Sequence, residues 1–230
     1  MAKDKKRRKK RKPWVRRWWL EGVIRAVQEP FVLRQLQRAI QASNARFDAA
    51  TSPEEKDWLA DSEGEVVEGM LGMAFIACQL DITSVVSSCQ KLHEFMPQLG
   101  PRPSRADLMV KNNPPVVATK HSKVAAIDGV ANYFKHQDEW PADWTKLKPS
   151  SRAFGTAEVV KALGVKADGY GVMTGFTTIV GHSQYEGVLE LREIVLNWAR
   201  KLKTEYEEKM ERRKLLPEAQ EGEDEECDLS

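Results

Sequence analysis

Three polar residues of different chemistry recur at intervals of four positions in the middle of the sequence. They are Asp128, Asn132 and His136, and Lys135 precedes the histidine. On an α-helix a step of four residues turns by only ~40°, so these side chains would form one stripe. Asp128 could then orient Asn132, Asn132 could hold a ligand or the imidazole, and His136 could act as a general acid or base. The residue types therefore predict a catalytic site of Asp128, Asn132, Lys135 and His136.

The same segment carries an apolar pattern, which decides where the polar stripe would lie. Val124, Ile127, Ala131 and Phe134 are spaced as on the buried face of a helix, and the polar stripe borders them. Polar groups at the edge of a buried face can line a cleft between helices. The alternative is a polar network that bridges helices without chemistry, and the sequence leaves both interpretations open.

Residues 128–140 read DGVANYFKHQDEW. This segment resembles the motif region of HEPN-type helical bundles, and the NYxKHxxEW pattern of a group of bacterial proteins, some of them connected with abortive infection. The resemblance implies a helical bundle that is usually dimeric and acts on RNA, in bacterial stress or phage defence. In active members it implies a metal-independent ribonuclease with a catalytic Arg and His. Asn132 and His136 match the motif, whereas the Arg has no counterpart, because no arginine lies between Arg105 and Arg152.

The beginning of the chain is strongly basic and contains tryptophan. Lys and Arg bind phosphates by releasing counterions, and exposed indoles stack on unpaired bases at ~1–3 kcal/mol per base. The predicted nucleic-acid-binding residues, with RNA as the favoured ligand, are Lys5, Lys6, Arg7, Arg8, Lys9, Lys10, Arg11, Lys12, Trp14, Arg16, Arg17 and Trp18. The same composition also suits an anionic membrane surface, a nuclear localisation signal, or a solubilising tail followed by a helix that packs on the domain.

Acidic residues collect at the other end, so the formal net charge of +2 hides a strong segregation of charge. Residues 218–228 hold Glu and Asp without any Lys or Arg. Segments of this kind repel themselves and remain solvated. We therefore expect a disordered basic arm over 1–12, a helical domain over 13–214 and a disordered acidic tail over 215–230, which could compete with RNA for the arm.

Cysteine usage and motifs limit the other classes of function. Three cysteines in 230 residues predict no disulfide framework and a reducing, cytoplasmic location. Cys78, Cys89 and His93 would lie along one helix and could not converge on a zinc ion. We expect no metal and no cofactor, and a non-catalytic protein-interaction module remains the alternative to an RNA-binding protein.

Membrane insertion is not expected from the sequence. No secretory signal is visible, because charged residues interrupt the apolar residues after the basic arm. The most apolar segment, 70–80, is about half the ~20 residues that a membrane span needs. A peripheral membrane protein that uses the tryptophan-containing arm stays open as a third alternative.

The periodicity of apolar residues predicts an all-α fold, a helical bundle with long loops. We expect helices from near Pro13, over 31–44, from Ser52 to Met96, over 120–138, over 156–164 and from near Gln184 onwards. Ser62 with Glu65 suggests a second helix start inside the third of these, and Asp81 a kink. Residues 97–119 are expected to be a loop. Residues 165–183, rich in Gly and Thr, could hold short strands at 170–172 and 177–180, or a loop with one helical turn.

Overall fold

The computed structural model describes residues 30–167 and 169–213 of the chain. The predicted helix from Pro13, the basic arm with its tryptophans, and the acidic tail lie outside the described residues. The described part is all-α, as predicted, with seven packed helices. Its one strand-like pairing is an isolated bridge between Pro115 and Ser122.

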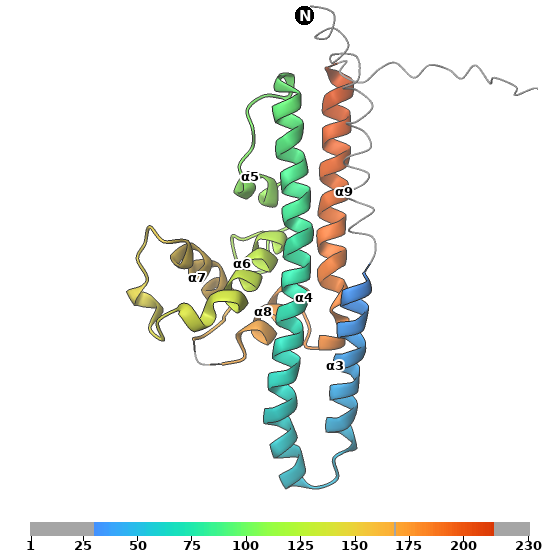
Figure 1. The fold of residues 1–230 in the computed structure, drawn as a ribbon, viewed down its shortest axis with the longest axis vertical. Coiled ribbons are helices and arrows are strands. Elements are labelled where there is room, and N and C mark those ends of the chain that lie inside the picture. The colour runs from blue at the N-terminus through green and yellow to red at the C-terminus, as the bar shows by residue number, and fades with distance from the viewer. Residues whose placement is uncertain (1–29, 168, 214–230) are drawn as a thin grey trace, which may run out of the picture.

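A long central helix, α4 (Pro53–Phe95), organises the described part (Figure 1). Helix α3 (Phe31–Ala49) runs antiparallel to its first half, and α9 (Leu189–Arg212) lies along its second half. Ser52 begins α4 as predicted, since its hydroxyl accepts a hydrogen bond from the Glu55 backbone N–H at 3.1 Å. On the other side, α6 and α8 pack on α4, and α5 and α7 pack on α6, so α4 contacts both layers.

The second helix start at Ser62 is wrong, and α4 is helical through Asp81. The Ser62 hydroxyl donates to the Trp58 carbonyl, four residues earlier, at 3.1 Å. Serines in the interior of a helix make this hydrogen bond, whereas a capping serine accepts one from a backbone N–H. Both flanks of this position continue the apolar packing of the same helix, with Leu59 and Val67 buried. Tertiary packing therefore overrides the local capping pattern.

Two shorter helices differ from the prediction at their beginnings. Helix α5 (Arg105–Val110) lies inside the segment expected to be a loop, and a capping box of Ser104 and Asp107 starts it. Helix α7 (Arg152–Ala162) is capped by Ser151 and not by Thr156, whose hydroxyl donates to the Arg152 carbonyl at 3.2 Å. In both cases a serine accepts the backbone N–H of the third helical residue.

The strands considered for 165–183 are absent, because α8 (Gly171–Val180) occupies this segment. Glu68 of α4 accepts the backbone N–H groups of Val172 and Met173 at 2.6 and 2.8 Å, which caps the start of α8. The carboxylate comes from a residue far away in the chain, so the local sequence carries no sign of it. Burial raises the pKa of Glu68, and the two backbone hydrogen bonds oppose that rise.

Helix α6 (Lys123–His136) lies between α4, α7 and α8. Val124, Ile127 and Ala131 are fully buried, as their spacing predicted. Phe134 is partly buried and lies against Gly72 of α4, where an added Cβ would approach its ring to 2.4 Å. The close packing of α4 and α6 places Asp128 beside Gln79 of α4.

By length and composition α4 alone among the described helices could cross a membrane. Half of its most apolar window of 18 residues is buried by the rest of the fold. This apolar window is longer than the expected segment 70–80. The core helix of a soluble protein passes the same test of length and composition.

Candidate functional site

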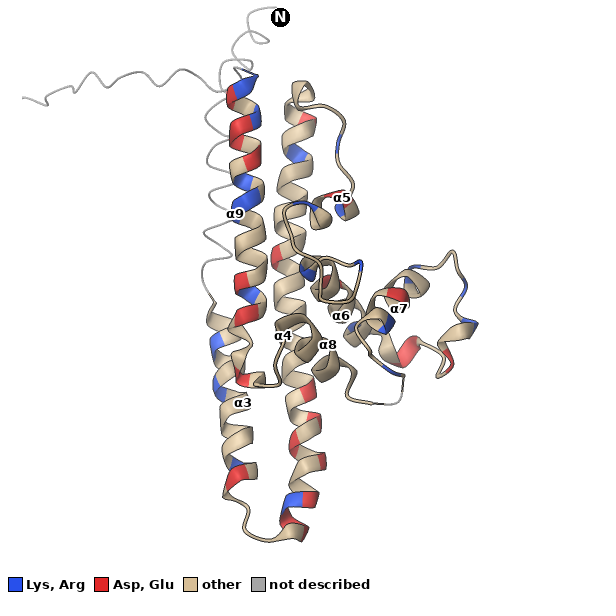
Figure 2. Ribbon diagram, turned by 180° about the vertical axis from the view of Figure 1, so that it is seen from behind, with Lys and Arg blue, Asp and Glu red and all other residues tan. Residues whose placement is uncertain are grey.

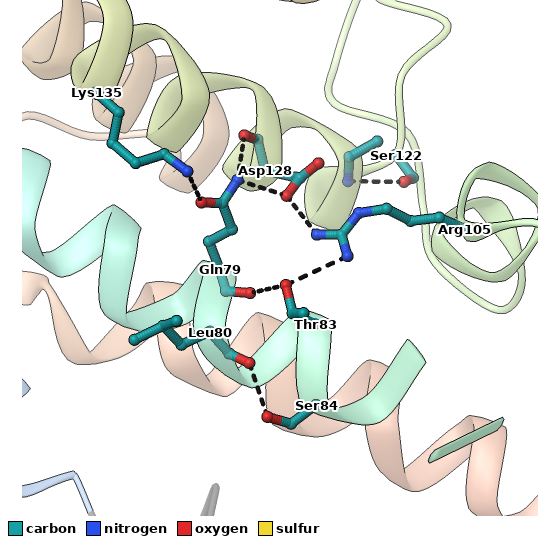
Figure 3. Close-up of polar contacts among 9 residues, drawn as sticks. Gln79, Leu80, Thr83, Ser84, Arg105, Ser122, Asp128 and Lys135 are labelled. Carbon is teal, nitrogen blue, oxygen red and sulfur yellow. Dashed lines mark hydrogen bonds and ion pairs between the residues drawn. The ribbon is translucent and has the colours of Figure 1, made fainter. Parts of the chain in front are cut away.

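Asp128 of α6 is the centre of a polar network between α4, α5 and α6 (Figure 3). Its Oδ1 accepts hydrogen bonds from Gln79 Nε2 at 2.8 Å and from Arg105 Nη2 at 2.6 Å. Gln79 Nε2 also lies 3.2 Å from the Asp128 carbonyl oxygen. The Asp128 side chain is only 13% exposed, so its negative charge is nearly buried and is neutralised there by the Arg105 guanidinium.

Two cations mark the ends of this network. The Arg105 guanidinium, 34% exposed, also donates from Nη1 to the Thr83 hydroxyl at 3.3 Å. At the other end the Lys135 ammonium donates to Gln79 Oε1 at 2.6 Å. The Gln79 amide therefore bridges a carboxylate and an ammonium, and its two ends are both satisfied.

Each member of the network is placed by the start or the packing of its helix. The Ser104 capping box makes Arg105 the first residue of α5, from which its side chain reaches α6. The Ser122 hydroxyl caps α6 and donates to the Met109 carbonyl at 2.7 Å, which ties α5 to α6. The Thr83 hydroxyl also donates to the Gln79 carbonyl at 2.8 Å. The cluster is thus held by short local bonds and by contacts across three helices.

The structure does not join the three residues of the predicted stripe. Asp128 is buried, Asn132 is half-buried, and His136 is exposed at the last residue of α6. The His136 imidazole is 48% exposed, and its Nδ1 lies 3.2 Å from Glu139 Oε1. Among the described residues no hydrogen bond connects Asp128, Asn132 and His136. The drift of ~40° per step explains this, since two steps carry His136 ~80° from Asp128.

Three members of the network, Gln79, Thr83 and Arg105, were not predicted from the sequence. The Ser104–Asp107 pattern could have revealed the short helix that begins with Arg105, because Ser followed by an acid three positions later is a helix start. Nothing in the local sequence pairs Arg105 with Asp128, which is 23 positions away. Arg105 is the cation that the predicted site lacked, but it compensates Asp128 and does not contact His136.

The histidine of α4 is held by two hydrogen bonds, and the thiols of Cys78 and Cys89 are buried. The His93 ring is buried, with Nδ1 2.9 Å from the Gly100 carbonyl and Nε2 2.9 Å from the Tyr206 hydroxyl. Since a carbonyl only accepts, Nδ1 carries the hydrogen and Tyr206 donates to Nε2 in the neutral imidazole. Burial raises the pKa of Cys89 to about 12 and also raises that of Cys78. Within 30–167 and 169–213 no group of three or more His, Cys, Asp and Glu is placed to hold a metal ion.

Two further carboxylates on α4 have opposite electrostatic surroundings. Burial raises the pKa of Asp81 to about 6, although the Arg192 guanidinium of α9 lowers it. Hydrogen bonds from Arg46 and Ser43 of α3 lower the pKa of Glu63 to about 2. Asp81 is thus weakly compensated, whereas Glu63 is strongly paired.

Comparison with protein-family models, with curated proteins and with solved structures finds no match.

Proposed function

We propose that the protein binds RNA, or another single-stranded nucleic acid, through its basic arm, and that the helical domain is a non-catalytic scaffold for that arm. The observation that carries the proposal is the separation of charge along the chain, with the Lys and Arg of residues 3–17 opposed only by Asp4. A cluster of this density neutralises several phosphates and releases their counterions. Tryptophans directly after it offer flat surfaces on which bases stack.

The geometry of the described residues supports binding over cleavage. The Arg105 guanidinium is used by Asp128, and the Lys135 ammonium is used by Gln79. The polar neighbour of the His136 imidazole is the Glu139 carboxylate. The adjacent Lys135 side chain points away from it, towards α4 (Figure 3). A ribonuclease needs an acid–base group and a cation directed at the same phosphate. The basic arm remains the part of the chain best suited to bind phosphates.

The salt dependence of RNA affinity tests the proposal. The affinity of the full chain for a fluorescent single-stranded RNA is measured by anisotropy at several salt concentrations. A chain in which Lys5 to Lys12 are all changed to Gln should bind far more weakly. Its log–log salt slope should be shallower by about 0.7 for each phosphate that the arm no longer neutralises. Equal slopes for the two chains would refute the arm as the binding element.

Tryptophan variants separate stacking from charge. Trp14→Ala with Trp18→Ala should weaken RNA binding by ~1–3 kcal/mol for each base that no longer stacks, and should leave the salt slope unchanged. Trp144→Phe in the helical domain is the matched control and should bind RNA normally. Binding only to anionic vesicles, and not to RNA, would indicate the membrane-surface alternative instead.

The His136→Ala variant separates binding from catalysis. We expect it to keep the RNA affinity of the wild-type chain, because His136 lies outside the arm. Cleavage of RNA that resists EDTA and disappears in this variant would establish the ribonuclease alternative and overturn the scaffold role.

Removal of residues 217–230 tests competition between the two charged ends. If the acidic tail occupies the arm, the shortened chain should bind RNA more tightly at low salt and equally well at high salt. Unchanged affinity at low salt would exclude this competition.

A further inference from the structure

The outer face of α4 carries an apolar stripe that no described element covers. Its members are Val66, Gly69, Met73, Ile76 and Leu80, which we call the α4 stripe. They are separated by three and four positions, the spacing with which one helix packs on another. Val66, Met73 and Leu80 are 43%, 49% and 65% exposed. In Figure 1 this part of α4 passes in front of α6 and α8, while α3 and α9 lie to one side.

The polar residues that extend this face have their hydroxyls satisfied inside the helix. Ser84 donates to the Leu80 carbonyl at 3.0 Å. Ser62, before the stripe, donates to the Trp58 carbonyl at 3.1 Å. A hydroxyl that already donates loses little when water is removed from it. The whole face from 62 to 84 can therefore be buried at small cost.

Gly69 gives an independent indication that another helix approaches this face. The absence of a side chain at Gly72 is required by packing within the chain, because a Cβ there would come within 2.4 Å of the Phe134 ring. A Cβ on Gly69 would meet nothing within 4 Å. Glycine inside a helix costs ~1 kcal/mol relative to alanine, and no contact within the described residues requires it here. Close approach of a second backbone would use the missing side chain.

We infer that the α4 stripe is the contact surface for a second copy of this chain, with the two α4 helices antiparallel about a two-fold axis near Met73. A two-fold contact joins a surface to itself, and the stripe is nearly symmetric about Met73. In this register Val66 of one copy faces Leu80 of the other, and Gly69 faces Ala77, which borders the stripe and is partly buried in its own chain. Small residues thus meet small residues on both sides of the axis.

The charge distribution of α4 selects the antiparallel arrangement. Glu63 is paired with Arg46 and Glu68 caps α8, but the other acidic residues of this part of α4 are exposed before Val66 or next to it: Glu54, Glu55, Asp57, Asp61 and Glu65. Figure 2 shows them as red bands on the half of α4 that pairs with α3. Parallel helices would place the two acidic segments side by side, whereas antiparallel helices place them at opposite ends. Like charges in a contact cost several kcal/mol, so the antiparallel pair is favoured.

The length of the face sets the expected strength of the dimer. From 62 to 84 a helix rises ~1.5 Å per residue, which gives a contact of about 33 Å. One helix on each side buries an area near the lower limit for a specific interface, at about 1,000 Å². A reversible dimer with a dissociation constant in the micromolar range is therefore expected.

Sedimentation equilibrium of the full chain over a range of concentrations tests the inference. The wild-type chain should form a reversible dimer, and Met73→Lys should weaken it by at least about tenfold, because two ammonium groups meet at the axis. Val117→Lys is the matched control, since Val117 is 86% exposed and lies outside α4. A wild-type monomer at all concentrations, or a dimer unaffected by Met73→Lys, would overturn the inference.

Two further variants keep the test independent of folding defects. Met73→Cys in a Cys227→Ser chain should form a disulfide-linked dimer, whereas Val117→Cys in the same chain should not. Cys78 and Cys89 are buried and should not interfere.

Gly69→Ala should raise the unfolding midpoint of the dilute monomer by about 2–4 °C and yet weaken the dimer. A stronger dimer in Gly69→Ala would contradict the close approach of the helices. Loss of binding to anionic vesicles in Met73→Lys, with no dimer in the wild type, would assign the face to a lipid surface instead.

Discussion

The inner and outer faces of α4 use similar residues for different purposes. Gly72 on the inner face is filled by the Phe134 ring, whereas Gly69 on the outer face has open space around it. Phe75 is fully buried, and Met73, two positions earlier, is half exposed. Hydrogen bonds follow the same division, since Gln79 bonds to another helix while Ser84 bonds back to its own. Packing within the described residues therefore accounts for the apolar residues on the inner face of α4 and not for those on its outer face.

Removal of a large side chain from each face gives the strongest contrast. Phe75→Ala should lower the free energy of unfolding by ~3–5 kcal/mol, because it leaves a cavity between packed helices. Met73→Ala in dilute protein should change it by less than about 0.5 kcal/mol, as expected for a surface position. Urea denaturation followed by circular dichroism measures both values. Similar losses of stability for the two variants would show that the outer face is covered within the chain.

The polar network provides the next contrast, between a buried and an exposed ion pair. Asp128→Ala should cost ~2–3 kcal/mol, somewhat less than a fully buried pair, because the Arg105 side chain is 34% exposed. Glu139→Ala removes the exposed partner of His136 and should cost less than about 0.5 kcal/mol. The same denaturation experiment compares them. An Asp128→Ala chain as stable as the wild type would favour a role of this network in binding over a role in folding.

The two glycines should respond to alanine with opposite signs. Gly72→Ala should destabilise the fold by ~1–3 kcal/mol, because the Phe134 ring has to move. Gly69→Ala should stabilise the dilute monomer by up to ~1 kcal/mol, because alanine favours the helix. Thermal unfolding monitored at low protein concentration distinguishes the signs. Equal shifts in the same direction would indicate that helix propensity alone governs both positions.

The smallest expected effects concern the pH dependence of stability, because the pKa shifts of two α4 carboxylates, Asp81 and Glu63, have opposite signs. The pKa of Asp81 is raised to about 6 from 3.8. Its ionisation therefore lowers the free energy of unfolding increasingly as pH rises from about 4 to 6, and by a constant amount above pH 6. Asp81→Asn should therefore be more stable than the wild type at pH 7 and equal to it near pH 4.

The pKa of Glu63 is lowered to about 2 from 4.5, so its stabilising contribution is present above pH 4.5 and is lost as pH falls towards 2.

Glu63→Gln should accordingly be less stable than the wild type at pH 7, with a difference that shrinks below pH 4.5. The unfolding midpoint of each variant is measured from pH 7 down to the acid limit of folding. Parallel pH profiles for Asp81→Asn and Glu63→Gln would show that neither carboxylate has the surroundings described above.

The sequence predicts the helical class, the start of the central helix α4 and the buried face of α6. Ser52 followed by Pro53 and Glu55 begins α4, and the apolar spacing of Val124, Ile127 and Ala131 defines the buried face of α6. These features act within one or two helical turns, so a local pattern is sufficient to read them. The position of Asp128 beside a buried face was readable for the same reason.

The packing of the helices fixes which polar groups meet and which residues of 165–183 form a helix. Asp128 is paired with Arg105 across 23 positions, and α8 is capped by Glu68 across 104 positions. Contacts over such separations depend on how whole helices pack, and one sequence does not encode them in any local pattern. The exposed face of α4 belongs to the same category, because the sequence shows its apolar spacing but only the packing of the other helices leaves it uncovered.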